Sequence, residues 1–242
     1  MVIYYEQIDS TNRVAKELVQ EGNVSGTIVR AGMQTGGKGQ NGRTFNSPAG
    51  GLYFSLLLQP DLQLEQLPLI TLATGVACRD VIYSMCKLEP QIKWPNDIYL
   101  NNKKVAGILC ENVILHNSEV PTVVIGVGLN VNSKVADFPP EIQSIVTTLS
   151  EHLKMNFDLN ELLSSLVTAI INSVSSLRRD QQGVLARWQR YDYLTNKPVI
   201  HTAGSVIRKG IGCGITPEGY YRIKDDKGVE HCLVGGQLRP QL

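Results

Sequence analysis

The glycine-rich segment of residues 32–51, GMQTGGKGQNGRTFNSPAGG, restricts the possible folds more than any other part of the sequence. Residues 37–42 match the G-x-G-x-x-G dinucleotide fingerprint, and residues 32–38 match a P-loop that lacks its final Ser or Thr. Both motifs need a helix that begins within the glycines, because its N-terminus binds the phosphates. Here Pro48 and Gly50-Gly51 break any helix, and the next apolar run is typical of a strand. A Rossmann domain and a P-loop ATPase are therefore not expected, which disfavours a nicotinamide-dependent oxidoreductase.

The same segment has a composition that suits an anionic ligand. Lys38 and Arg43 flank backbone amides that are free to point towards a phosphate. Ordering so many glycines costs conformational entropy, so we expect a bound ligand to order the loop. The alternative is a flexible surface loop without any ligand.

Hydrophobic periodicity predicts alternating strands and helices, followed by a change of character near the C-terminus. Strands are expected at residues 2–8, 27–34, 51–60, 91–100, 103–114 and 121–132, and helices at residues 11–20, 67–85 and 161–177, the last continuing towards Trp188. After about residue 189, short strands alternate with glycine-containing turns, which predicts a small β-barrel-like domain. The domains are therefore residues 1–188 and 189–242. The strand at 121–132 could lie at a sheet edge and pair with a copy of itself, so a homodimer is left open.

Composition excludes several classes of protein. A net charge of +1 gives no general electrostatic reason to bind DNA or an acidic membrane. The N-terminus does not resemble a signal peptide, and no uninterrupted apolar run approaches ~18 residues. The five cysteines are widely spaced without C-x-x-C, which indicates reduced thiols in a cytoplasmic protein. The four histidines lack the spacing of zinc ligands.

A second motif, KWPND at residues 93–97, is followed by KVAG at residues 104–107. Pro95 removes a hydrogen-bond donor from a sheet, and Asp97 places a carboxylate among apolar residues, so both are costly there. The alternative is a plain hairpin, in which Asn-Asp closes a turn and Lys104 is a solvated turn lysine.

Taken together, the motifs Ser10-Thr11-Asn12, Gln34 with the glycine loop, KWPND, KVAG and IGVGLNVN resemble the biotin–protein ligases along essentially the whole chain. The resemblance implies an α+β fold of the class II synthetase-like, biotin–lipoate ligase type: a mixed β-sheet with helices packed on it and a C-terminal SH3-like β-barrel. It implies a biotin–[acetyl-CoA-carboxylase] ligase, which uses ATP and Mg²⁺ to form biotinyl-5′-AMP and then modifies a lysine of a biotin carboxyl carrier domain. The glycine loop would close over that adenylate.

The resemblance also implies roles for individual residues. Biotin would be contacted by Ser10, Thr11, Asn12, Gln34, Lys38, Gly39, Gln40 and Lys104. ATP and the adenylate would be contacted by Gly37, Lys38, Gly39, Gln40, Arg43 and Asn130, the last near the adenine. The catalytic residues would be Lys104, Asp97 and Arg43, with Mg²⁺ carried by ATP near Asp97 and no separate metal site. Ser10, Thr11 and Asn12 are equally suited to cap a helix.

The sequence departs from the family pattern in the glycine loop. Lys38 and Gln40 stand where arginines are usual, and Phe45 stands where a tryptophan is more common. Lysine lacks the bidentate fork of arginine, and glutamine carries no charge, so the adenylate would be held more loosely. An apolar wall for biotin is expected around Trp94 and residues 106–108, although Trp94 could equally belong to the core.

Two further functions stay open at this stage. A lipoate or octanoate ligase or transferase shares the fold but would not need the polar set of Ser10-Thr11-Asn12 and Gln34. A non-catalytic nucleic-acid-binding module is disfavoured by the near-zero net charge. The first strand begins at residue 2, so we expect a monofunctional enzyme without an N-terminal helix-turn-helix and without sequence-specific DNA binding.

Overall fold

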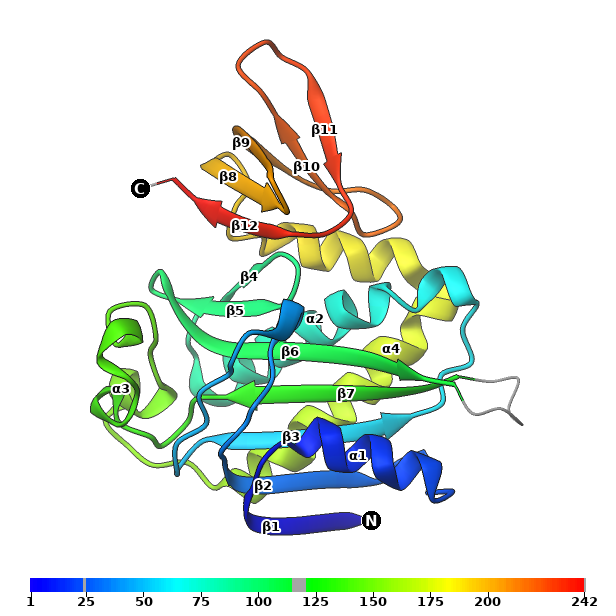
Figure 1. Cartoon of the computed structure of the whole chain (residues 1–242), viewed down its shortest axis with the longest axis vertical. Coiled ribbons are helices and arrows are strands. Elements are labelled where there is room, and N and C mark those ends of the chain that lie inside the picture. The colour runs from blue at the N-terminus through cyan, green and yellow to red at the C-terminus, as the bar shows by residue number, and fades with distance from the viewer. Residues whose placement is uncertain (24, 115–120, 242) are drawn as a thin grey trace.

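A computed structural model of the chain describes residues 1–23, 25–114 and 121–241. Its main part is a seven-stranded mixed sheet in the order β1-β2-β3-β7-β6-β5-β4 (Figure 1). The strands are β1 (Val2–Ile8), β2 (Ile28–Gln34), β3 (Leu52–Leu58), β4 (Gln91–Lys93), β5 (Asp97–Leu100), β6 (Lys103–Val113) and β7 (Thr122–Leu129). β1 and β2 run parallel, and the remaining neighbours are antiparallel.

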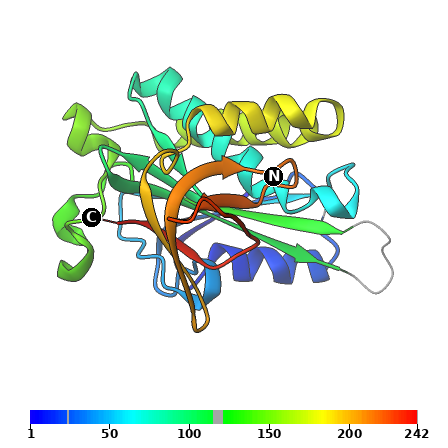
Figure 2. The same ribbon diagram turned by 90° about the horizontal axis from the view of Figure 1, so that it is seen from above.

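Helices cover both faces of this sheet. Helix α1 (Thr11–Gln20) packs on one face, while α2 (Leu69–Cys86) and α4 (Leu159–Arg190) pack together on the other (Figure 2). Because both faces are covered, β3 reads as a nearly continuous apolar run and is buried along most of its length. By length and composition α2 could cross a membrane, but 72% of it is buried inside the fold, as expected of a core helix. Helix α3 (Leu149–Leu153) is short and was not predicted.

Two predictions about strands were wrong. The segment 91–100 forms two strands, β4 and β5, separated by a turn at residues 94–96, because Pro95 cannot donate to a ladder. The strand predicted at 121–132 does not lie at an edge: β7 is hydrogen-bonded to β3 on one side and to β6 on the other. It therefore has no free edge on which a second copy of the chain could pair.

The C-terminal strands form a second antiparallel sheet in the order β11-β10-β9-β8-β12. Their bounds are β8 (Pro198–Ala203), β9 (Val206–Ile215), β10 (Tyr221–Lys224), β11 (Glu230–Leu233) and β12 (Gln237–Pro240). In the described residues this sheet is open, with β11 and β12 at its edges, so it is barrel-like without being a closed barrel.

The tryptophan of KWPND joins the two sheets. The indole Nε1 of Trp94 donates a hydrogen bond to the carbonyl oxygen of Gly219 at 3.0 Å. Its ring lies 5.8 Å from the ring of Tyr221 in β10, and the side chain is only 3% exposed. Trp94 therefore belongs to the core between the sheets, and the small sheet is held beside the KWPND turn.

Candidate functional site

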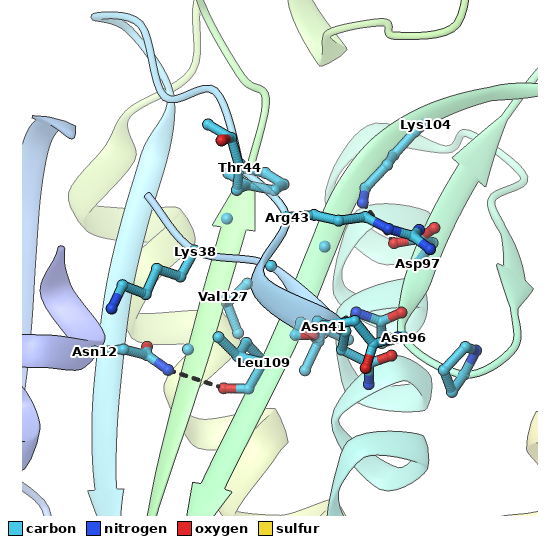
Figure 3. Close-up of a pocket in the computed structure, with 18 of the residues that line it drawn as sticks. Asn12, Lys38, Asn41, Arg43, Thr44, Asn96, Asp97, Lys104, Leu109 and Val127 are labelled. Carbon is cyan, nitrogen blue, oxygen red and sulfur yellow. Dashed lines mark hydrogen bonds and ion pairs between the residues drawn. The ribbon is translucent and has the colours of Figure 1, made fainter. Parts of the chain in front are cut away.

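One pocket contains most of the predicted site residues. It lies among the start of α1, the glycine loop, the KWPND turn, β6, β7 and the start of β12, and it encloses about 120 Å³ (Figure 3). The predicted residues that line it are Ser10, Thr11, Asn12, Gln34, Lys38, Gly39, Gln40, Arg43, Asp97 and Lys104. Residues from opposite ends of the domain are therefore assembled into one site, as the resemblance implied.

Gly37 and Asn130 are the two predicted residues that do not line this pocket. Gly37 is buried, and a Cβ at this position would overlap the carbonyl oxygen of Phe45, so glycine lets the loop fold against itself. Asn130 follows β7 and is 2% exposed, and its Nδ2 donates to the carbonyl oxygen of Thr147 at 3.1 Å. Its predicted contact with the adenine stays a prediction.

At the polar end of the pocket, Ser10 is the helix cap and its two neighbours are not. The Ser10 Oγ accepts the amide of Arg13 at 3.4 Å and so begins α1. The Thr11 hydroxyl instead donates to Gln34 Oε1 at 3.1 Å. The Asn12 Nδ2 donates to the carbonyl oxygen of Leu109 at 3.2 Å. Thr11 and Asn12 are thus free of the capping role that the sequence left open.

At the charged end, two lysines surround one carboxylate. Asp97 Oδ1 lies 2.6 Å from Lys104 Nζ, and Asp97 Oδ2 lies 3.5 Å from Lys93 Nζ. Lys104 is in β6 with its side chain 29% exposed, and it points into the pocket rather than into solvent (Figure 3). The turn-lysine interpretation is therefore wrong.

The ion pairs decide the charge state of this cluster. Burial raises the pKa of Asp97, but Lys104 and then Lys93 outweigh it and hold the pKa below its ordinary value. Burial lowers the pKa of Lys93, and Asp97 opposes that shift. Asp97 is consequently an ionised carboxylate and a weak base.

No group of three or more His, Cys, Asp or Glu residues that could hold a metal ion occurs in the described part of the chain. Sequence reasoning missed Lys93, which pairs with Asp97 across the KWPND turn. The signal that could have identified it is a lysine four residues before an aspartate in a turn motif.

The glycine loop lies over the middle of the pocket. Bridges pair Gln34 with Ser47 and Lys38 with Thr44, and a short 3₁₀ turn spans Gln40–Gly42. The Lys38 side chain extends to the side of Asn12, and Arg43 extends towards Asp97 and Lys104 (Figure 3). The loop cations are therefore distributed to both ends of the pocket.

The ring of Phe45 fits against two glycines in the sheet. A Cβ at Gly128 would overlap this ring, and a Cβ at Gly107 would lie 2.9 Å from it. The Lys104 Nζ stands 5.4 Å from the ring centroid. Phe45 thus anchors the loop to β6 and β7 beside the charged end.

The apolar wall was expected around Trp94 and residues 106–108, and Gly107 and Ile108 line the pocket whereas Trp94 does not. The wall is made by Ile108 and Leu109 of β6 and Val127 of β7, while Trp94 is buried elsewhere. Asn96 joins the KWPND turn to this wall, because its Nδ2 donates to the carbonyl oxygen of Ile108 at 2.8 Å. The pocket is also lined by Gln237 and Leu238 of β12 and by Gly236 just before it. Sequence reasoning missed these residues because nothing in the C-terminal turns marks proximity to the site.

The chain is similar to known proteins over its whole length. It matches the model of the Biotin/lipoate A/B protein ligase family over residues 4–130. It is 41% identical over 151 residues to the bifunctional ligase/repressor BirA of Bacillus spizizenii, covering 62% of this chain and 46% of that protein. It is 30% identical over 239 residues to the bifunctional ligase/repressor BirA of Escherichia coli, covering 96% of this chain and 71% of that protein. Its structure superposes on the biotin protein ligase from Aquifex aeolicus in complex with biotin and ATP with a TM-score of 0.86, at 28% identity and 99% coverage of both chains.

The extent of these matches differs between relatives. The alignment spans about half the length of the Bacillus relatives. The match to the family model nevertheless includes more than half of the 242 residues, from β1 to the residue after β7, and the pocket lies largely within it. The chain therefore belongs to the biotin/lipoate A/B protein ligase family.

Proposed function

We propose that this protein is a biotin–protein ligase, which uses ATP to join biotin to a lysine of a biotin carboxyl carrier domain through biotinyl-5′-AMP. One observation carries the proposal: a single pocket has neutral hydrogen-bonding groups at one end, with Lys38 beside them, an apolar wall in the middle and the Lys93–Asp97–Lys104 cluster at the other end. Biotin has a polar ring, an apolar chain and a carboxylate in the same order. Solved relatives hold biotin and ATP, or biotinyl-5-AMP.

In the first step, a carboxylate oxygen of biotin attacks the α-phosphorus of ATP and pyrophosphate leaves. The reaction depends on positioning and on stabilising the negative charge that develops on the phosphate oxygens. Lys104 is the residue best placed to supply a cation there, because Asp97 fixes its ammonium group at 2.6 Å. Arg43 extends to the same place from the glycine loop (Figure 3). Closure of that loop would keep water from the mixed anhydride.

We expect Mg²⁺ to enter the site bound to ATP. Asp97 is the carboxylate that lines the pocket, and Mg²⁺ usually binds through one or two carboxylates together with substrate phosphates. The residues therefore fit a nucleotide-carried ion held beside Asp97. When bound, it would screen the negative charge of the triphosphate.

In the second step, the amine of the carrier lysine attacks the carbonyl carbon of the anhydride, and AMP leaves. The amine must lose a proton to the solvent or to the departing phosphate, and Asp97 is the pocket carboxylate that could also accept it. Its pKa lies below the ordinary value, so we assign Asp97 to holding Lys104 and Lys93 rather than to removing that proton. The carrier domain is the proposed partner of the enzyme.

The direct test is to incubate the protein with biotin, ATP and Mg²⁺ and to measure biotinyl-AMP and pyrophosphate. Adenylate formation with biotin supports the proposal. The closest alternative is a lipoate or octanoate ligase or transferase, and adenylate formation with those acids but not with biotin would establish it instead.

Three further properties are proposed. The near-zero net charge argues against sequence-specific DNA binding, and a gel shift at physiological salt tests this expectation. The isolated thiols favour a cytoplasmic location, which fractionation tests. A homodimer would have to use a surface other than the edge of β7, and sedimentation measures it.

A further inference from the structure

Ser55 contacts two pocket residues without lining the pocket itself. It lies in the middle of β3 and is 0% exposed, beside Gly126 of β7. Its Oγ lies 2.8 Å from Thr11 Oγ1 and 2.6 Å from Asn12 Oδ1. A hydroxyl buried in a strand that reads LYFSLLL needs hydrogen-bond partners, and here both partners belong to the polar end of the pocket.

The side-chain amide of Asn12 has one orientation that satisfies its surroundings. Its Nδ2 donates to the carbonyl oxygen of Leu109 at 3.2 Å and to Glu111 Oε2 at 2.8 Å. The opposite orientation would place the amide oxygen against a carbonyl and a carboxylate. Lys16 holds the other oxygen of Glu111 at 2.9 Å, which keeps this carboxylate in place. Both N–H groups of Asn12 are therefore used, and Oδ1 can only accept.

The Thr11 hydroxyl oxygen can likewise only accept a further hydrogen bond, because its own proton is already donated. Gln34 Oε1 accepts from the Thr11 amide at 2.8 Å and from the Thr11 hydroxyl at 3.1 Å. The Gln34 Nε2 donates to Ser47 Oγ at 2.8 Å, and the Ser47 hydroxyl donates to the Phe45 carbonyl at 3.1 Å. Because an amide carries two N–H groups, Gln34 retains one for a ligand.

Ser55 has one proton and two oxygens within hydrogen-bonding distance, so it can donate to only one of them at a time, and the other oxygen is left without that donor. We propose that Ser55 is the positioning residue that sets the hydrogen-bonding pattern of this end of the pocket. Its proton is donated to either Asn12 or Thr11, and the other oxygen accepts a ligand N–H, while Gln34 donates to a ligand carbonyl. A cyclic urea, with N–H groups beside a carbonyl, is complementary to this pattern. This inference rests on the proposed function, in which biotin supplies the urea.

The test compares substitutions at Ser55 that differ in volume and in donor strength. Ser55→Ala removes the proton that Ser55 donates, and Ser55→Cys keeps a side-chain donor that is weaker and larger than the hydroxyl. For both variants, the Kd of biotin alone should rise by about tenfold, which corresponds to about 1.4 kcal/mol. The KM of ATP at saturating biotin should stay within roughly twofold, because the charged end is untouched. Ser55→Thr keeps the hydroxyl and should restore most of the biotin affinity.

Ser173→Ala is the matched control. The Ser173 hydroxyl is also buried and donates to the carbonyl oxygen of Ala73 at 2.8 Å, far from the pocket in α4. The Ser173→Ala substitution should lower the melting temperature as much as Ser55→Ala does, without changing the Kd of biotin. An unchanged biotin Kd in Ser55→Cys overturns the inference, and so does an equal rise in the KM of ATP. Absence of biotinyl-AMP formation by the wild type is a different result, because it removes the proposed function itself.

Discussion

The polar and charged ends of the pocket are built on opposite principles. At the polar end, hydrogen bonds join neutral groups on α1, β2 and β3, and Thr11, Asn12 and Ser55 are all at most 5% exposed. At the charged end, Lys93 and Lys104 share the single carboxylate of Asp97, so positive charge is in excess. A buried network of neutral hydrogen bonds is rigid and selects a ligand by shape and pattern, whereas surplus charge stabilises an anion that arrives later. The comparison therefore assigns recognition to one end and chemistry to the other.

The largest effect is expected from Lys104→Ala. Removing a cation from a developing negative charge should slow adenylate formation by roughly 10²–10³-fold. The Kd of biotin should change much less, because the polar end stays intact. Single-turnover release of pyrophosphate measures the first quantity, and Lys103→Ala, at the exposed neighbouring position, is the control. Near-normal pyrophosphate release would show that the charged end does not perform the chemistry.

Gly126→Ala should weaken recognition without changing the chemistry. A Cβ at Gly126 would overlap Asn12 Oδ1, so the amide must move. Such overpacking costs about 1–3 kcal/mol, which predicts roughly 10- to 100-fold weaker biotin binding and a nearly unchanged rate at saturating biotin.

Gly128→Ala is the matched variant for that experiment, because a Cβ there would displace Phe45 and the glycine loop instead. It should change the escape of the adenylate more than the Kd of biotin. If both alanines changed biotin binding equally, the two ends of the pocket would not be separable.

Gln40→Arg adds the charge that the glycine loop lacks. A charge-assisted hydrogen bond is worth about 1–2 kcal/mol more than a neutral one, so biotinyl-AMP should dissociate roughly tenfold more slowly. The measurement is the dissociation rate of preformed adenylate at two salt concentrations, with Gln20→Arg, at the exposed last residue of α1, as the control for added charge. Equal rates would mean that Lys38, Arg43 and Lys104 already compensate.

The smallest effect concerns stability. Burial lowers the pKa of Lys93 in the folded protein, so its charge costs stability at neutral pH. That cost should fall as pH rises from the lowered pKa towards the ordinary value of 10.5. Lys93→Met should therefore leave the free energy of unfolding unchanged or raise it by about 1 kcal/mol, while Asp97 keeps Lys104. Urea unfolding at several pH values measures it, and a loss of more than about 2 kcal/mol would show that Lys93 is structural.

Most elements could be predicted from the sequence because their signals are local. Ser10 caps α1, apolar spacing marks α2 and α4, and the glycines and prolines end the strands. The division of 91–100 into β4 and β5 was missed, although Pro95 carried the necessary signal. The position of β7 in the middle of the sheet had no such signal, because strand order depends on the partners that each strand finds.

The sequence by itself determined the motifs, their order and hence the residues that had to meet in one site. Only the tertiary structure decided which other groups join them. Ser55 contacts Asn12 across 43 positions of the chain, and Glu111 contacts Asn12 across 99. These contacts follow from sheet register, which places Ser55 and Leu109 opposite Gly126 from the two sides of β7. Register is set by the packing of the whole sheet, so the role of a lone serine in an apolar strand depends on the neighbours that the folded sheet places beside it.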